Sequence, residues 1–188
     1  MSQVIRARPL LQRRLLFGSS RGKDGFQTYR ITKKISTHPD QLYLIITDVS
    51  KYEEFVPFVT SSFVNQYDPD TKLPTEAGLR VGWKQYDESF TCKLICEENK
   101  VIAESMSILL FESLYNEWNL KEVKSRFTNE LSTLVELLLR YKFKNPFYNT
   151  LSSMFHNQVS NIMIKAFEER AMNLKIQSKL KDRMNNIA

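Results

Sequence analysis

The sequence contains few of the residues from which catalytic and metal sites are built. Only two histidines, two cysteines and five glycines occur among its 188 residues. Neither His38 nor His156 stands at a metal-ligand spacing or beside a plausible nucleophile, and the glycines form no phosphate-binding loop. We therefore expect no catalytic residues, no metal and no resident cofactor.

The two cysteines, Cys92 and Cys96, predict neither a disulfide nor a metal site. They are four positions apart in a predicted strand, which separates them by roughly 13 Å along the chain. That distance is too long for a disulfide or a shared metal ion. Because both fall on one face of the strand, we interpret them as small buried side chains, in keeping with a reducing compartment.

Long hydrophobic runs are also missing. A helix that crosses a membrane needs about 20 consecutive apolar residues, and the sequence has no such window. Any contact with a membrane is therefore expected to be peripheral.

Acidic residues are absent from residues 1–23, which carry six arginines and lysines. The rest of the chain has equal numbers of basic and acidic residues, so the net charge of +6 belongs to this leader. An arginine-rich, acid-free leader is typical of a mitochondrial transit peptide, and a disordered basic arm that binds phospholipid or RNA is the alternative. We place the leader at residues 1–25, one globular domain at 26–175 and a polar tail at 176–188.

Most of the domain has the alternating pattern of a sheet. Seven segments alternate apolar with polar residues, and we predict strands at 27–35, 63–67, 79–84, 90–96, 101–107, 115–121 and 133–143. The polar turns between them favour antiparallel order. Two short helical segments follow the first strand, and the second must end before Pro57.

The strongest periodic signal lies near the C-terminus. Large apolar residues repeat there every four positions: Phe147, Leu151, Phe155, Val159, Met163 and Phe167. Asn145 is placed to cap this helix, with Pro146 in its first turn. A helix of about 20 residues is roughly 30 Å long, sufficient to cover the apolar face of a sheet. The pattern predicts an α+β fold, in which a curved antiparallel sheet of about seven strands surrounds a long C-terminal helix.

Six segments, in the same order, carry a family resemblance: Ser50–Phe58, Gly78–Trp83, Glu88–Thr91, Glu117–Trp118, Tyr141–Pro146 and Ala166–Ala171. Over about residues 27–175 the chain resembles the mitochondrial coenzyme Q-binding proteins of the START (polyketide cyclase-like) superfamily. The resemblance implies a helix-grip fold, with ubiquinone or its late precursors as ligand. It also implies peripheral association with the matrix side of the inner membrane and a role in respiratory electron transfer and quinone synthesis. Respiratory or quinone-synthesis complexes are then the candidate protein partners.

A quinone with an isoprenoid tail requires a hydrophobic cavity, because each buried CH₂ group gains about 0.8 kcal/mol on leaving water. Alternation and the helical stripe direct a set of side chains inward. These predicted ligand contacts are Val81, Trp83, Phe90, Trp118, Leu137, Leu139, Tyr141, Phe155, Val159 and Met163. Each of them can equally be an ordinary core residue.

Two connections are candidates for a lid and for a membrane contact. Phe55, Val56 and Pro57 separate the short helices from the sheet, where a lid over the cavity mouth is expected, and we include them among the ligand contacts. Residues 108–111 are four consecutive apolar residues in a connection. The predicted membrane contacts are Leu109, Leu110 and Phe111; a loop folded onto the core is the alternative.

Three classes of function are compatible with these patterns. The first is a non-catalytic quinone carrier, which we favour. The second is an enzyme of the cyclase or hydratase type, with Tyr86, Glu104, Glu117 or Tyr141 as acid or base. The third is a ribosome-binding or protein-interaction module. The neutral domain argues against the third and against nucleic acid as a partner, because RNA affinity comes chiefly from neutralising phosphates.

Overall fold

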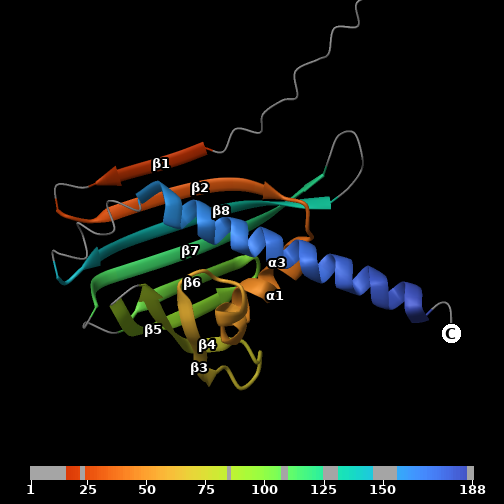
Figure 1. Cartoon of the computed structure of the whole chain (residues 1–188), viewed down its shortest axis with the longest axis horizontal. Coiled ribbons are helices and arrows are strands. Elements are labelled where there is room, and N and C mark those ends of the chain that lie inside the picture. Colours follow the sequence, from red (N-terminus) through yellow and green to blue (C-terminus); the bar gives the residue numbers. More distant parts are fainter. Residues whose placement is uncertain are drawn as a thin grey trace, which may run out of the picture.

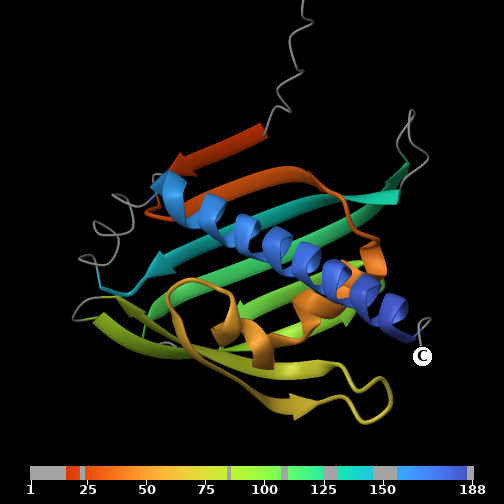
Figure 2. The ribbon, with the colours of Figure 1, turned by 45° about the vertical axis from the view of Figure 1, so that its right-hand side comes forward.

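An antiparallel sheet of eight strands curves around one long helix (Figure 1). This architecture is that of a computed structural model, which describes residues 16–21, 24–83, 86–106, 110–124, 131–145 and 156–185. The helix lies across the concave face of the sheet (Figure 2). The α+β helix-grip fold expected from the sequence is confirmed.

The sheet contains the seven predicted strands and one more. Its strands are β1 (Leu16–Arg21), β2 (Gln27–Ile35), β3 (Val59–Tyr67), β4 (Pro74–Trp83), β5 (Tyr86–Glu97), β6 (Lys100–Ser105), β7 (Phe111–Lys124) and β8 (Leu131–Phe143). Their order across the sheet is β1-β2-β8-β7-β6-β5-β4-β3. Strands β3 to β8 therefore form a meander, and β2 closes it by pairing with β8, with Ile31 opposite Leu137.

The helices lie on one side of this sheet. They are α1 (Pro39–Thr47), the short 3₁₀ helix η1 (Val49–Glu54) and α3 (His156–Asn185). Helix α1 begins after His38, whose Nδ1 accepts a hydrogen bond of 3.3 Å from the backbone N–H of Asp40. None of the helices in the described ranges has the apolar stretch needed to cross a membrane.

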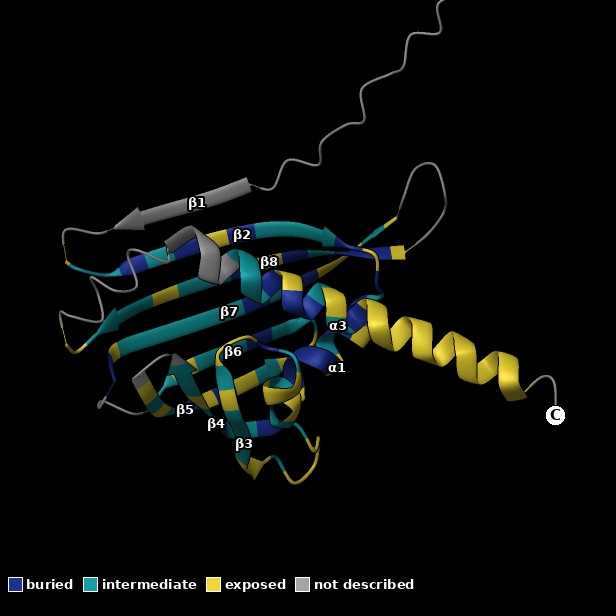
Figure 3. Cartoon of the chain, in the orientation of Figure 1, coloured by how far each residue is buried: buried dark blue, intermediate teal, exposed yellow. Residues whose placement is uncertain are grey.

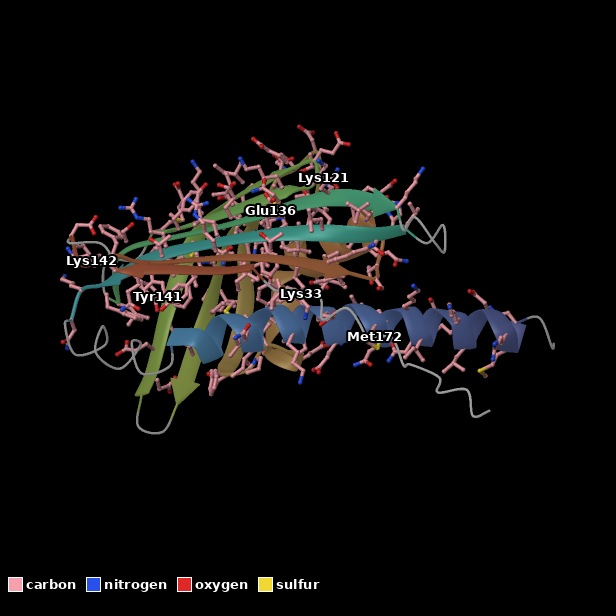
Figure 4. All side chains as sticks on the ribbon, turned by 90° about the horizontal axis from the view of Figure 1, so that it is seen from above. Lys33, Lys121, Glu136, Tyr141, Lys142 and Met172 are labelled. Atoms are coloured by element: carbon pink, nitrogen blue, oxygen red, sulfur yellow. The ribbon has the colours of Figure 1, made fainter. Side chains whose placement is uncertain are left out.

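Alternation along the strands separates the two faces of the sheet. In Figure 4, Lys121 and Glu136 project from the face that points away from α3, whereas Tyr141 and Lys33 lie on the side of the helix. Lys33 of β2 forms a partly buried ion pair with Glu168 of α3. This pair fixes the helix against the sheet.

The main core lies where α1, α3 and the centre of the sheet meet. Leu42 of α1, Val135 of β8 and Phe167 of α3 are completely buried there. These residues occupy the apolar stripes of the two helices and the inward positions of the strand, as the sequence periodicity requires.

The predicted leader boundary at residue 25 is wrong for the fold, because β1 comes from within residues 1–25. It pairs antiparallel with β2, with Phe17 opposite Ile31. Without β1, that side of β2 would be an open sheet edge with unpaired N–H and C=O groups. The assignment of the leader as a transit peptide stays a prediction.

The predicted polar tail is also different in the structure. Helix α3 continues to Asn185, and its residues from Met172 onward are exposed (Figure 3). Residues 176–185 contain neither glycine nor proline, and half of them are lysine, leucine, arginine or methionine, which favour helix even in solvent. The predicted start of this helix at Asn145 and Pro146 cannot be compared, because residues 146–155 lie outside the described residues.

Candidate ligand cavity

A cavity of about 350 Å³ lies between the concave face of the sheet and α3. Strands β3 to β8 supply its wall, α3 covers it, and the segment from α1 to β3 borders it. Apolar side chains form most of the lining, because inward positions of these strands are almost all apolar. Such a space suits a hydrophobic ligand and offers few polar contacts.

Eight of the predicted ligand contacts line this cavity: Val56, Pro57, Val81, Phe90, Trp118, Leu139, Tyr141 and Met163. They come from five separate elements and one connection, which the fold brings together. Register explains the grouping within the sheet, since Leu139 and Tyr141 of β8 lie opposite Asn116 and Leu114 of β7. Whether these residues contact a ligand stays a prediction.

Two predicted contacts lie elsewhere. Leu137 is buried in the main core, one strand repeat away from Leu139, because α1 and α3 close over that part of the sheet. The ring of Phe55 packs edge-on against Phe167, with centroids 5.1 Å apart, and borders an outer groove between α1 and α3 instead of the cavity. Phe155 and the side chains of Trp83 and Val159 lie outside the described residues.

The predicted membrane contacts Leu110 and Phe111 are buried, and both line the cavity. The ring of Phe111 packs against Phe143 and Phe90, with centroids 4.8 and 5.1 Å away. The prediction of a membrane-dipping loop is therefore wrong for these two residues: aromatic contacts hold the end of the loop on the core. Leu109 lies outside the described residues.

The cavity reaches the surface beside the connection between η1 and β3. Val56 is buried, whereas Pro57 and Phe58 are exposed and still line the cavity. Phe58 has a φ of 68°, a left-handed conformation that is unusual for a bulky residue. Its carbonyl accepts a hydrogen bond of 2.9 Å from the N–H of Gly82. This connection forms the rim of the cavity, at the position predicted for a lid.

Several lining residues were not predicted, although the sequence contained a signal for many of them. Leu79, Cys92, Leu94 and Phe143 continue the alternation of predicted contacts on the same strands. Asn116 interrupts the apolar alternation between Leu114 and Trp118, so a polar group at an inward position was visible in the sequence. Others, such as Ile46 and Ile162, required the packing of the helices to be known.

Burial raises the pKa of two ionisable groups in the wall, Tyr52 and Cys92. The Tyr52 hydroxyl donates a hydrogen bond of 2.5 Å to the carbonyl of Ile46, and burial raises the pKa of Tyr52. Burial likewise raises the pKa of Cys92 to about 12. Both cysteines are free thiols. The wall therefore presents thiol and phenol groups in their neutral forms at physiological pH.

A small hydrogen-bonded cluster borders the cavity beside β2. Gln27 and Tyr29 of this strand are buried, and Tyr141 of β8 lies beside them. The hydroxyls of Tyr29 and Tyr141 donate to Oε1 of Gln27 over 3.0 and 3.2 Å. Burial raises the pKa of Tyr29, so this phenol stays a neutral donor.

Comparison with known proteins places this geometry in one family. Residues 35–168 match the family described as "Polyketide cyclase / dehydrase and lipid transport". The chain is 38% identical over 170 residues to the mitochondrial coenzyme Q-binding protein COQ10 of Eremothecium gossypii, covering 88% of this chain and 82% of the relative. It is also 38% identical to the protein of that name from Saccharomyces cerevisiae, covering 79% and 72%.

Solved structures share the fold at low sequence identity. A START superfamily protein from Mycobacterium smegmatis matches with a TM-score of 0.62 at 16% identity, covering 78% of this chain and 98% of that one. The Zhui aromatase/cyclase from Streptomyces sp. R1128 matches with a TM-score of 0.59 at 13% identity, covering 78% and 94%.

Proposed function

We propose that this chain, which belongs to the mitochondrial coenzyme Q-binding proteins of the START (polyketide cyclase-like) superfamily, holds ubiquinone or a late biosynthetic precursor as a lipid carrier. The observation that carries the proposal is the apolar cavity of about 350 Å³ between sheet and helix. A carrier of this kind supports respiratory electron transfer and quinone synthesis by keeping an insoluble lipid available.

The size of the cavity limits what it encloses. Ligand sites in proteins span roughly 300–1,000 Å³, so about 350 Å³ suits a ring and the first part of a prenyl tail. The rest of a long tail then leaves through the rim at Pro57 and Phe58, which are both exposed. Each CH₂ group that stays inside gains about 0.8 kcal/mol, which is sufficient for retention without any covalent step.

A carrier fits the wall better than an enzyme does. Of the acids and bases considered from the sequence, Tyr141 lines the cavity, Glu104 is exposed, and the side chain of Tyr86 lies outside the described residues. The hydrogen bonds from Tyr115 and Asn119 lower the pKa of Glu117. This carboxylate is therefore ionised, and it does not line the cavity. The aromatase/cyclase neighbours share the fold alone, and the curated relatives carry the name of binding proteins.

The test is to purify the protein from respiring cells and to extract its lipid. We expect an isoprenoid quinone in stoichiometric amount. An Ala103→Phe variant places a ring into the cavity from β6 and should carry much less lipid, whereas Glu104→Gln on the outer face should carry the normal amount. A wild-type protein free of quinone would refute the proposal, and turnover of added quinone precursors would favour the enzyme.

We further propose that the protein works at the matrix face of the mitochondrial inner membrane. The mitochondrial names of its relatives and its acid-free leader support the compartment. The exposed end of α3 supports the membrane contact. Its apolar residues recur every four positions: Met172, Ile176, Leu180 and Met184 are 53%, 49%, 53% and 71% exposed.

A basic stripe runs beside this apolar stripe. Lys175, Lys179 and Arg183 each precede one of its members by one residue, and Asp182 is the one acid between residues 172 and 185. Parallel apolar and basic stripes are the pattern of a helix that lies in an anionic lipid interface. Each basic group near such a surface contributes about 1 kcal/mol.

Flotation with lipid vesicles tests this contact. We expect binding to vesicles that contain anionic lipid, weaker binding to neutral vesicles, and loss of binding in the double variant Ile176→Ser, Leu180→Ser. The matched control is Tyr67→Ser, which removes an equally exposed apolar group from β3. Equal flotation of the double variant and the control would eliminate α3 as the membrane surface.

A further inference from the structure

One polar group in the cavity wall lacks a hydrogen bond. The carboxamide oxygen Oδ1 of Asn116 is buried, and it has no hydrogen-bond partner among the described residues. The two tyrosine hydroxyls of the described wall both have hydrogen-bond partners, since Tyr52 donates to Ile46 and Tyr141 donates to Gln27. Among the side-chain oxygen atoms of the described lining, Oδ1 of Asn116 therefore differs from the two tyrosine hydroxyls.

Its neighbours on the sheet cannot supply the missing donor. Asn116 lies on β7 directly between Ala103 of β6 and Leu139 of β8, and neither side chain has a polar hydrogen. Backbone N–H groups there belong to the strand ladder. An unsatisfied buried acceptor shifts an equilibrium by a factor of about 5 to 150 against the state that contains it, so a bound ligand that offers no donor to Oδ1 is disfavoured by that factor.

The hydrogen-bonded cluster of Gln27, Tyr29 and Tyr141 lies beside the same part of the wall. Tyr141 lies two residues beyond Leu139 on β8, which makes it a diagonal neighbour of Asn116 on the same face. Gln27 and Tyr29 lie behind Tyr141 and bind it through hydrogen bonds. Away from this place the lining is apolar apart from the thiol of Cys92 and the hydroxyl of Tyr52, which is already bonded to Ile46. A ligand with a polar ring and an apolar tail is thus oriented with its ring at Asn116.

We propose that Oδ1 of Asn116 accepts a hydrogen bond from a ring hydroxyl of the bound lipid, so that the cavity selects hydroxyl-bearing rings. This inference rests on the proposed function and names the form of the ligand: a reduced quinone, or a phenolic precursor. An oxidised quinone ring carries carbonyl and methoxy oxygens, which only accept hydrogen bonds, so it leaves Oδ1 unsatisfied while the carboxamide keeps the orientation seen in the structure. The preference for the hydroxyl form is about 5- to 150-fold.

The experiment compares a short-tailed ubiquinol with its oxidised form, by calorimetric titration without oxygen. Wild type should bind the quinol about 5- to 150-fold more tightly. Asn116→Leu should lose this preference and bind the oxidised form at least as tightly as wild type does. The matched control is Asn119→Leu on the same strand, whose Nδ2 donates to Glu117 and whose side chain does not line the cavity; it should keep the preference.

The unfolding temperature of the variant tests whether Asn116 has a structural role. Because no described group of the protein binds Oδ1 of Asn116, Asn116→Leu should not lower the unfolding temperature of the empty protein. A lower unfolding temperature would mean that Asn116 has a structural partner, and it would overturn the inference. Equal binding of both forms by wild type overturns this inference but leaves the carrier function intact, whereas binding of neither form overturns the carrier function as well.

Discussion

Replacement of Phe167 by alanine is the sharpest test of how the helix is held against the sheet. The ring is completely buried on α3, and its centroid lies 4.8 Å from Trp118, 5.2 Å from Tyr52 and 5.1 Å from Phe55. Truncating a buried phenylalanine costs about 3–5 kcal/mol, and each lost aromatic contact accounts for about 0.5–1.5 kcal/mol of that. With three such contacts, we expect a loss of about 4 kcal/mol in the free energy of unfolding.

Urea and thermal unfolding, followed by circular dichroism, measure this loss. A domain of this size loses about 2–4 °C in melting temperature per kcal/mol, so the shift should be about 8–16 °C. The urea dependence of the unfolding free energy should keep its slope, because the surface exposed on unfolding hardly changes. Met172→Ala, on the exposed side of the same helix, is the control and should stay within about 0.5 kcal/mol of wild type.

A loss below about 1 kcal/mol would refute this reasoning, since a ring at that position would then contribute no more than a surface residue. So would a loss equal to that of Met172→Ala. Either result would mean that α3 does not pack over the sheet in solution as described, and the cavity beneath it would have no cover.

Three further predictions concern the wall and the helix contact. Gly78→Ala should lower the free energy of unfolding by about 1–3 kcal/mol, because its Cβ would lie 2.3 Å from Cζ of Phe63 and 2.9 Å from a backbone oxygen. Thermal unfolding measures this loss, and adding Phe63→Ala should restore part of the lost stability. The free energy of unfolding should fall above pH 9, because burial raises the pKa of Cys92 from 9.0 to about 12; the stability from the neutral thiol is complete below pH 9 and is lost as pH rises toward 12. Urea titrations at pH 8 and pH 10 measure this fall, which should be smaller in the Cys92→Ala variant. Glu168→Gln should cost about 1–2 kcal/mol by leaving the partly buried Lys33 unpaired, and a further Lys33→Met change should recover most of it.

Local patterns predicted the elements of this fold well. Alternation placed every strand from β2 to β8, because each has one buried and one exposed face, as in Val135 and Glu136. The added strand β1 was missed because composition marks residues 16–21 as leader, whereas an open edge of β2 decides that they pair. The exposed end of α3 was missed for a similar reason: it buries nothing, so intrinsic helix propensity alone sustains it.

The candidate site was predicted only in part, since periodicity gives the face of a side chain and not its depth. Leu137 and Leu139 share one face of β8, yet the first packs under the helices and the second lines the cavity. The loop at Leu110 and Phe111 was misjudged because a run of apolar residues looks the same whether it contacts lipid or folds inward. The long-range partners Phe90 and Phe143 decide that question, and local sequence does not contain them.

The pairing of β2 with β8 has a consequence for how the protein folds. Thr28 lies opposite Arg140 in the finished sheet, so the contact that closes it joins the two ends of the domain. Such distant pairings close slowly, because a long loop must be ordered before it gains any contact. The curved wall is therefore complete only after β8 has paired with β2, and its apolar concave face stays uncovered until α3 packs over it.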